Sequence, residues 1–533
     1  MRCVMLAAFA GSCVALTSPT LFAGDAQIVY PIAAHSLSNP ARANVPGMAG
    51  LQFTNFGRMH RSDGTAWVTV PVVSGAASAA QDQLVLVGHG TLGLVSAQEG
   101  VSTVDGSGTL LNLSSGAVPR INDASQWALA FTPASSTFAR VVKSTAGGIA
   151  TTANSFDAAP ALGANAMYGP GFASHGITRT GAVSFQNDLI IDPDFSIGTR
   201  ANLADNGATV VARVNQTVPL NQLGGSTLPL TALEFANTGS GTYHTSADGS
   251  KRLSLGDLGA ATPGTQRVLL VNTAVVLQAG QVVAGFTITT IDECWMESNG
   301  DWFAKGTVTP VGGGATVQAI YRNGVQIARI GAPIFPGATE NWTTFVDYKG
   351  DNYRRWAIVG VSSAPTLTNS VIVMSSKFVV ARANDPVALE LDGLFNDSLY
   401  LQGFRDRCFM GNDAFFYVGA RLKNNNTATS SLGANVSMVR IALPGVPCSA
   451  ADIADDAGNP LPTLSPNNGV NEGDYNAFFN NFFTDQSIGS PADIADDSGS
   501  PLPPFGPAGG TNNGVNEGDY NAFFNTFFSG CAG

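Results

Sequence analysis

Residues 297–308 read ESNGDWFAKGTV, a short polar turn that leads directly into a strand in which apolar and polar residues alternate. The same unit recurs along the chain at a spacing on the order of sixty residues. The other copies are RSDGTAWVTV from Arg61, NDASQWALAF from Asn122, TRTGAVSFQ from Thr178, SADGSKRLSL from Ser246, DYKGDNYRRWAIVG from Asp347 and GNDAFFYVGARL from Gly411. About seven copies of one unit predict a repeat architecture, in which each unit packs against its neighbours.

A pair of β-rich runs joined by a small polar turn trails each copy. Examples are LVLVGHGTLGLV at 84–95, ARVVKSTAGGIA at 139–150 and AIYRNGVQIARIG at 319–331. Asn323-Gly324 in the last example is a strong signal for a two-residue hairpin. Because the alternation has a period of two residues rather than 3.6, these runs predict strands and not helices. A repeat of three or four antiparallel strands is one blade of a β-propeller.

The last copy lacks an outer strand of its own. After FFYVGARL the chain continues with VSMVRIALP and then reaches a Pro, a Gly and Cys448. The missing strand is supplied by AQIVYPIAA at 26–34, which would join the two ends of the ring in one blade and remove two sheet edges. We therefore expect an all-β propeller of about seven blades, closed by the amino-terminal strand. Six or eight blades, or a pair of β-sandwich domains, are the alternatives.

The amino-terminal segment has the pattern of a secretory signal. One Arg precedes an apolar run from Val4 to Leu16, and a polar stretch then ends in the small residue Ala23. No later run of about twenty apolar residues occurs, so no transmembrane span is expected. The net charge is −12 and no basic cluster is present, which argues against nucleic acid as a partner. These observations predict a secreted or cell-surface protein.

The end of the chain is a second, nearly exact duplication. Residues 451–483 read ADIADDAGNPLPTLSPNNGVNEGDYNAFFNNFF, and residues 492–528 read ADIADDSGSPLPPFGPAGGTNNGVNEGDYNAFFNTFF. Each copy is an acidic, Asn- and Gly-rich loop, and calcium takes six to eight oxygen ligands from such loops. The candidate ligands are Asp452, Asp455, Asp456, Asn468, Asn471 and Asp474 in the first copy and Asp493, Asp496, Asp497, Asn513, Asn516 and Asp519 in the second. The alternative is a solvated acidic linker that ends in an apolar helix.

Each loop leads into a short aromatic helix. In the first helix, which we expect to start at Asp474, the aromatic residues are Tyr475, Phe478, Phe479, Phe482 and Phe483. Their i, i+3, i+4, i+7 spacing places them on one face, and the second copy repeats the pattern from Tyr520 to Phe528. A segment this small needs a staple besides its core, either metal or the disulfide Cys448–Cys531 that would bracket it. Whether Cys294 and Cys408 pair is left open.

The duplicated segment resembles a dockerin, of the variety that ends in Gly-Cys (here Gly530-Cys531) and is found on secreted proteins of planctomycete-like bacteria. The resemblance covers residues 448–531. It implies that each repeat binds calcium and that the paired helices dock onto a cohesin-type or cell-surface partner. Ala454 and Ala495 stand where dockerins usually carry Asn or Asp, and an insertion makes each loop longer than a twelve-residue EF-hand loop. The implied organisation is a signal peptide at 1–23, the propeller-like body at 24–445 and the dockerin-like module at 446–533.

No motif for catalysis is apparent in the body. The His residues form no His-x-x-x-His pair, and no Gly-x-Ser-x-Gly elbow occurs. His60 and His244 precede their turns closely, so one face of the ring could hold both. Asp192 with Asp194, and Asp292 with Glu293, are carboxylate pairs by sequence only, and the latter could face the central channel. For Trp127, Trp302, Trp342 and Trp356 we expect core positions rather than sugar stacking.

Two functions fit these observations. The favoured one is an exported, non-catalytic binding or cell-surface protein, which the dockerin-like tail attaches to a partner. The alternative is a carbohydrate-active enzyme, a polysaccharide hydrolase or lyase anchored by the tail, with a glycan on the propeller face. An enzyme predicts a cluster of carboxylate, His or Tyr groups with shifted pKa values at one mouth of the ring. A binding protein predicts a smooth mouth lined by Asn, Ser and aromatic residues.

Overall fold

The computed structural model of the chain describes most of the body and much of the tail. The described residues are 26–30, 44–106, 108–113, 118–134, 136–191, 196–214, 217–219, 227–234, 242–259, 261–352, 355–376, 378–388, 398–413, 415–429, 431–432, 436–443, 449–455, 457–461, 470–502 and 511–529. The predicted signal segment 1–23, Asp192, Asp194, Asp456, Asn468 and the proposed Cys448–Cys531 disulfide lie outside them. No helix within these ranges is both long and apolar enough to cross a bilayer.

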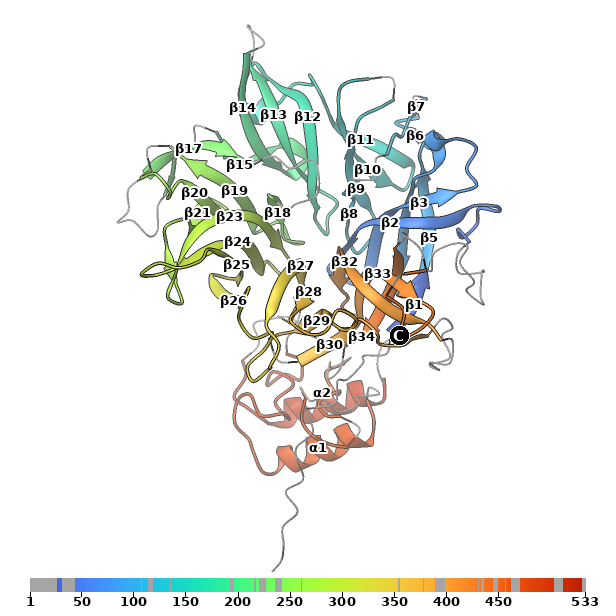
Figure 1. The fold of residues 1–533 in the computed structure, drawn as a ribbon, viewed down its shortest axis with the longest axis vertical. Helices are drawn as coiled ribbons and strands as arrows, with labels where there is room; N and C mark the ends of the chain where they lie inside the picture. Colours follow the sequence, from blue (N-terminus) through green and yellow to red (C-terminus); the bar gives the residue numbers. More distant parts are fainter. Residues whose placement is uncertain are drawn as a thin grey trace, which may run out of the picture.

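Seven sheets, each with a core of antiparallel strands, are arranged as the blades of a closed ring (Figure 1). Parallel pairs occur at the outer side of two of them, between β6 and β11 and between β31 and β1. Blade 1 comprises β2 (Gln52–Arg61), β3 (Ala66–Ser74), β4 (Leu84–His89) and β5 (Leu92–Gln98). Blade 2 comprises β8 (Arg120–Ile121), β9 (Trp127–Phe131), β10 (Arg140–Thr145) and β11 (Gly148–Asn154), with β6 (Thr103–Val104) and β7 (Thr109–Leu110) beyond β11. Blade 3 comprises β12 (Ala166–Ile177), β13 (Val183–Ile191), β14 (Ser196–Ala204) and β15 (Thr209–Arg213).

Blade 4 has a divided first position, because two strands pair with β19 on the same side. It comprises β18 (Tyr243–Thr245), β19 (Arg252–Leu258), β20 (Arg267–Val271) and β21 (Ala274–Gln278), with β16 (Thr217–Pro219) and β17 (Thr227–Leu233). Blade 5 comprises β23 (Phe286–Met296), β24 (Trp302–Pro310), β25 (Val317–Arg322) and β26 (Val325–Arg329), with β22 (Val282–Val283). Blade 6 comprises β27 (Trp342–Gly350), β28 (Trp356–Ser362), β29 (Ser370–Met374) and β30 (Phe378–Arg382). Single 3₁₀ turns occur at Ala79–Gln81, Pro160–Leu162 and Asp205–Gly207.

Blade 7 joins the two ends of the ring, which confirms the predicted closure. Its strands are β32 (Tyr400–Met410), β33 (Phe415–Lys423), β34 (Ser437–Ala442) and β1 (Ala26–Tyr30), with β31 (Val387–Ala388) on the far side of β1. β1 runs antiparallel to β34, with Ile28 opposite Val439. The Ile28 side chain is fully buried in the core that blades 6 and 7 share, whereas Tyr30 packs 4.9 Å from Phe53 of blade 1. The five residues of β1 thus connect blades 6, 7 and 1.

The turn that recurs in the sequence is the connection between the first and second strands of every blade. In each blade the N–H of the first turn residue bonds to the carbonyl group four or five residues later, as from Glu297 to Asp301 at 2.8 Å. The first strands contact one another around the axis: β2, β8, β12, β18 and β23 follow in order, and β27, β32 and β2 complete the circle. All seven turns therefore meet at one face of the ring.

Apolar side chains fill the seams between the blades. Trp127 and Trp342 are fully buried and Trp302 and Trp356 nearly so, which confirms that these indoles are core residues. Cys294 of β23 and Cys408 of β32 are both buried and free, so they do not pair with each other. The Cys408 thiol lies 3.3 Å from Asp347 Oδ2.

One acidic residue at the seam of blades 6 and 7 should make stability depend on pH. Asp385 accepts a hydrogen bond from the Arg382 N–H at 2.7 Å, and burial raises the pKa of its carboxyl from 3.8 to about 6. The folded state therefore binds the proton more tightly than the unfolded state, and this stabilisation, present below about pH 4, is lost as the pH rises through 6. At about 1.4 kcal/mol for each pKa unit, the change is up to about 3 kcal/mol.

Asp385→Asn should remove that dependence. We expect the difference in unfolding free energy between the variant and the wild type to change between pH 4 and 7, in favour of the variant at the higher pH. Urea unfolding followed by tryptophan fluorescence measures it. A difference that stays constant over this range would contradict the assigned shift.

The tail consists of α1 (Glu472–Phe482) and α2 (Glu517–Phe527), which lie outside the ring, below blades 6 and 7 in the view of Figure 1. The helices are those expected, but each begins two residues before the predicted Asp. Asn471 and Asn516 are the N-caps, and the acid sits at the third helical position as a capping box. The stacked rings of Phe478 and Phe523, 4.0 Å apart, form the centre of the tail core.

Candidate functional sites

The last acid of each predicted calcium loop closes the loop through backbone amides. Asp474 Oδ1 accepts hydrogen bonds from the Ile453 and Ala454 N–H groups at 2.7 and 2.8 Å, and Oδ2 accepts one from Asn471 N–H at 2.9 Å. Asp519 makes the same three contacts in the second copy, at 2.7, 2.8 and 2.9 Å. Both side chains are fully buried, and burial raises the pKa of both carboxyls against the lowering effect of these amides.

The middle acids of the loops accept hydrogen bonds from nearby turns. Asp455 Oδ1 accepts from Asn459 N–H at 2.8 Å, and Asp496 Oδ1 accepts from Ser500 N–H at 3.0 Å. Asp497 Oδ1 accepts from the Asn516 amide group at 2.8 Å and from Asn513 N–H at 3.1 Å. Among the described residues, no three His, Cys, Asp or Glu side chains lie close enough together to hold a metal. The acids of the two loops named so far therefore bond mainly to groups of their own loops.

Asp493 differs from the other acids of the second loop. Its Oδ2 accepts a hydrogen bond from Gly489 N–H at 2.6 Å, whereas its buried Oδ1 has no hydrogen-bond partner. Its charge also helps to raise the pKa of the Asp519 carboxyl, so the two acids interact. A buried carboxylate oxygen without a donor suits a cation better than it suits an empty loop. Asp493 is therefore the residue of this set that fits calcium best.

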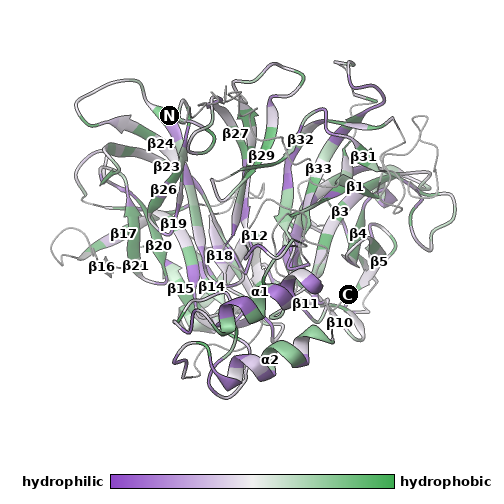
Figure 2. Cartoon of the chain, turned by 90° about the horizontal axis from the view of Figure 1, so that it is seen from below, coloured by the Kyte–Doolittle hydropathy of each residue, from purple (hydrophilic) through white to green (hydrophobic). Residues whose placement is uncertain are grey.

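The tail carries nearly all of the net charge of the protein. Residues 446–533 hold eleven of the 38 acidic residues and none of the 26 basic ones, which leaves 27 acidic against 26 basic residues elsewhere. In Figure 2 hydrophilic and hydrophobic residues alternate along both helices, whose first turns are acidic and whose carboxyl ends are Phe482 and Phe527. At those ends the C-cap residues Phe483 and Phe528 are 72% and 80% exposed. The duplication therefore presents the same apolar side chain twice on an acidic module.

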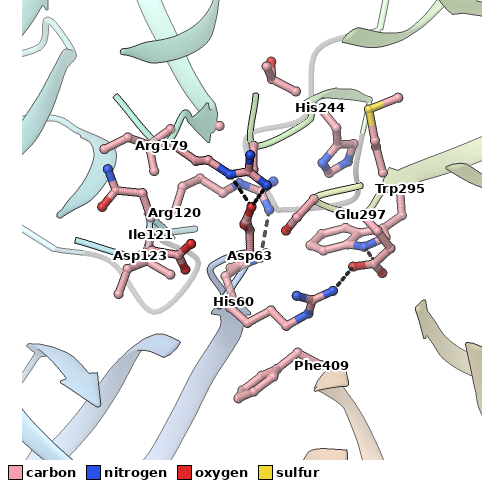
Figure 3. A pocket seen from close by; sticks show the side chains of 18 of the residues that line it. His60, Asp63, Arg120, Ile121, Asp123, Arg179, His244, Trp295, Glu297 and Phe409 are labelled. Atoms are coloured by element: carbon pink, nitrogen blue, oxygen red, sulfur yellow. Dashed lines mark hydrogen bonds and ion pairs between the residues drawn. The ribbon is translucent and has the colours of Figure 1, made fainter. Parts of the chain in front are cut away.

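A second site, which the sequence analysis did not identify, lies at the face where the seven turns meet. Here the blade 1 turn reaches across the axis. The Asp63 carboxylate binds Arg179 of blade 3 (Figure 3). The backbone carbonyl oxygen of Asp63 accepts a hydrogen bond from the Asn352 side-chain amide of blade 6 at 2.7 Å. Under this turn is a cavity with a volume of about 60 Å³. It is lined above all by the penultimate residue of each first strand: His60, Arg120, Gly176, His244, Trp295, Lys349 and Phe409.

Trp295 occupies the centre of this cluster. The His60 ring stacks on it with centroids 5.2 Å apart, and the His244 ring lies 4.7 Å away. Lys349 Nζ is 4.1 Å from the indole centroid, a cation–π distance. With these neighbours around it, the indole is part of the wall of the cavity rather than a platform on which a sugar could stack.

Most charges at the mouth are matched by a partner. Glu297 accepts from Trp295 Nε1–H and from Gly350 N–H, both at 2.7 Å, and forms an ion pair with Arg61 at 3.3 Å. Burial raises the pKa of Glu297, and these partners oppose the shift. Lys349 Nζ lies 2.6 Å from Asp347 Oδ1. Although burial alone would lower its pKa, the pKa of Lys349 is raised by Asp347 and further acidic neighbours.

Arg120 and His60 form a pair that fixes the tautomer of the histidine. Arg120 Nη1 lies 2.8 Å from His60 Nδ1. A guanidinium can only donate, so Nδ1 is the acceptor and the ring proton is on Nε2. Burial, followed by Arg120 and Lys349, holds the pKa of His60 well below its usual value, which keeps the ring neutral. His60 Nε2 and Arg120 Nε are both buried without a hydrogen-bond partner, and Arg120 forms no ion pair with any described residue.

The sequence-based hypotheses for this face were partly right. His60 and His244 do lie at one face of the ring, as expected. Asp292 and Glu293 do not line the cavity, because Glu293 turns to Lys305 at 2.6 Å; Trp295 and Glu297 line it instead. The mouth is not the smooth Asn, Ser and aromatic surface expected of a binding protein, since cations and His surround it. Aligning the copies on their turns is the signal that would have found these residues.

No protein-family model matches the chain, and no curated protein matches it. Several solved structures match the chain at low similarity. The Dos1 propeller is 8% identical, with 74% of this chain and 80% of that chain covered and a TM-score of 0.33. The propeller domain of the Trilobed protease from Pyrococcus furiosus is 7% identical, with coverages of 72% and 98% and a TM-score of 0.32. An oligogalacturonate lyase in complex with manganese is 9% identical, with coverages of 75% and 99% and a TM-score of 0.34.

The class that the fold defines is a seven-bladed β-propeller with a small helical region at its carboxyl end. The similarities to solved structures are too low to assign a function.

Proposed function

We propose that this protein is an exported, non-catalytic binding protein that the helical tail attaches to a partner. The observation that carries the proposal is the pair of equivalent, largely exposed phenylalanines, Phe483 and Phe528, on a module without a single basic residue. Exposed apolar groups of this size, when grouped with others, mark interaction surfaces. Each phenylalanine directly follows a helix end that packs against a tyrosine at the start of the other helix, Phe482 against Tyr520 and Phe527 against Tyr475. Tyr475 and Tyr520, about two-fifths exposed on the same helices, extend the surface in both copies.

The partner that fits this surface is a cohesin-type or cell-surface protein domain with an apolar pocket and a rim of Lys or Arg. Electrostatic complementarity with an acidic module speeds association and excludes acidic competitors. Calcium is part of the proposal: Asp493 Oδ1 and oxygens of the neighbouring loop would hold it, and its charge would relieve the repulsion between Asp493 and Asp519. Secretion or display at the cell surface is proposed from the leader sequence.

The attachment surface can be tested with the full chain. Phe483→Ser combined with Phe528→Ser should reduce capture of a cohesin-type domain, immobilised on a sensor, by at least about tenfold, because large buried anchors dominate such interfaces. Both residues follow their helices and are exposed, so helix content should not change. The matched control is Ile488→Ser, another exposed apolar residue of the tail, which lies outside the two helices.

Each capture is repeated with calcium and with excess chelator. Loss of capture in chelator supports the calcium part of the proposal. Equal capture by the wild type and the double variant would contradict the assigned surface. If excess chelator does not change capture, calcium is not needed for attachment, and the assignment of the surface still holds.

A polysaccharide hydrolase or lyase is the second candidate, favoured by the titratable cluster at the ring mouth. Each acid that lines this cavity has a partner: Glu297 has three donors, Asp123 accepts from the Gly64 N–H, and one oxygen of Asp63 is held by Arg179, while its Oδ1 has no hydrogen-bond partner. A glycosidase needs one acid and one base or nucleophile that can face the sugar bond. For this reason we place the enzyme second. Turnover of any polysaccharide on an array by the purified protein would reverse the order.

A further inference from the structure

The cavity at the ring mouth contains one buried cation that forms no ion pair with any described residue. Arg61 pairs with Glu297, Lys349 with Asp347, and Arg179 with the buried Asp63 carboxylate. Arg120 instead contacts the neutral His60 and an indole face 5.2 Å away, and Glu297 acts on it only from beyond ion-pair distance. Burial and Arg58 lower the pKa of Arg120 to about 9 although Glu297 opposes the shift, so Arg120 is still charged at neutral pH. Buried charges in proteins are normally paired, because leaving one unpaired costs several kcal/mol.

Two neighbouring donors in the cavity have no partner. His60 Nε2–H and Arg120 Nε–H both lack an acceptor, and both residues line the cavity and are more than nine-tenths buried. Asp63 Oδ1 also lacks a hydrogen-bond partner, but the other oxygen of that carboxylate is held by Arg179. Unsatisfied buried donors are rare in native proteins and call for an acceptor from water or a ligand. A guanidinium without an ion pair beside two free N–H groups favours an anionic acceptor over a neutral one.

We propose that the ring-mouth cavity binds a small carboxylate, which pairs with Arg120 and accepts hydrogen bonds from His60 and Arg120. The one guanidinium without an ion pair matches one carboxylate, whereas a phosphate near its dianionic form would bring a second negative charge that no free cation of the described cavity residues matches. A cavity of about 60 Å³ has room for a group the size of acetate but not for a sugar ring. This site is separate from the tail, so it stands or falls independently of the attachment function.

The ion pair that covers the cavity determines the size of the molecule whose carboxylate can enter. Arg179, 61% exposed, reaches in from solvent to the buried Asp63 carboxylate of the blade 1 turn. With that ion pair closed, a free small acid fits. A carboxylate at the end of a larger molecule, such as a uronic acid, requires the pair to open. Both sources share the same contacts to Arg120 and His60, and they are separated by the size of the ligand.

Calorimetric titration of the full chain with acetate, and separately with glucuronate and with inorganic phosphate, tests the proposal against sodium chloride at equal ionic strength. We expect saturable one-to-one binding of acetate. Arg120→Gln should weaken it at least about tenfold, since it removes the guanidinium that has no ion pair among the described residues. His60→Phe keeps a ring against Trp295 and removes the Nε2 donor, so it should also weaken binding. The matched control is Arg140→Gln, a change of the same charge on blade 2 outside the cavity.

The outcomes are distinct. Binding of acetate alone identifies a free small acid as the ligand, and binding of both acids identifies a terminal carboxylate; either supports the proposal. Thermal unfolding adds a second readout: acetate should raise the melting temperature of the wild type and not that of Arg120→Gln. Should Arg120→Gln fail to fold, His60→Phe carries the comparison. The absence of saturable binding by the wild type, or binding of phosphate in preference to acetate, would overturn the proposal.

Discussion

Ile28→Asp is expected to unfold the propeller at room temperature or to leave it only marginally stable. The Ile28 side chain is fully buried in the strand that closes the ring, within the core that blades 6 and 7 share. A carboxylate at this position would be desolvated without a partner and would leave an apolar gap around it. Substitutions of this kind belong to the largest destabilising class, at roughly 4–5 kcal/mol or more. The loss also opens the ring, because β1 is the fourth strand of blade 7.

The neighbouring residue provides the control for this prediction. Gln27 lies on the same strand, and its Oε1 accepts hydrogen bonds from Arg440 Nε and Nη2 at 3.0 and 2.8 Å. Gln27→Glu therefore adds the same negative charge opposite a guanidinium and should leave stability unchanged or slightly higher. Urea unfolding followed by tryptophan fluorescence compares the three proteins. Equal midpoints for Ile28→Asp and the wild type would show that the ring does not depend on this strand.

Asp474→Ala combined with Asp519→Ala should abolish the helical fold of the tail and leave the propeller folded. Each carboxylate accepts three backbone N–H bonds that hold its loop against its helix. An unsatisfied buried donor costs about 1–3 kcal/mol, so each loop loses several kcal/mol. A module with only two short helices has no reserve of that size. Circular dichroism at 222 nm should lose its helical contribution.

Two further variants separate this effect from a loss of charge. Asp485→Ala removes one negative charge at a fully exposed position after α1 and should not change the spectrum. Asp474→Asn with Asp519→Asn keeps one acceptor oxygen per side chain and should fall between the wild type and the alanine pair. A wild-type spectrum for the alanine pair would mean that the loops are held by other contacts.

Much of the fold was predictable because it depends on patterns that repeat. The polar turn followed by an alternating strand marked the same connection in all seven blades, and AQIVY was recognisable as the strand that the last copy lacked. The aromatic spacing of the tail identified both helices. Their starting points were missed by two residues, because an Asn cap and an Asp three positions later both suit a helix start.

The ring mouth was not predictable by the same reasoning. His60, Arg120 and Lys349 are separated by many residues, and no motif links them. Only the register of the strands shows that the penultimate residue of each first strand faces the axis. The match of Lys349 with Asp347, and the absence of such a match for Arg120, depend on side-chain packing between different blades. In the tail, the acids were predicted as calcium ligands, and their hydrogen bonds to backbone amides depend on a loop conformation that the sequence pattern does not specify.

The penultimate residue of the first strand is the position at which each blade contributes to the ring mouth, and its chemical type differs from blade to blade. Seven equivalent places hold His60, Arg120, Gly176, His244, Trp295, Lys349 and Phe409. Phe409 belongs to the apolar core of blades 7 and 1, and Trp295 packs against that of blades 5 and 6. The other five positions lie outside these two cores, so an exchange at one of them changes the rim and leaves that apolar packing in place. Gly176 leaves one place without a side chain. The ring mouth is thus built from one residue of each blade, and its ligand selectivity can change through substitutions in single blades.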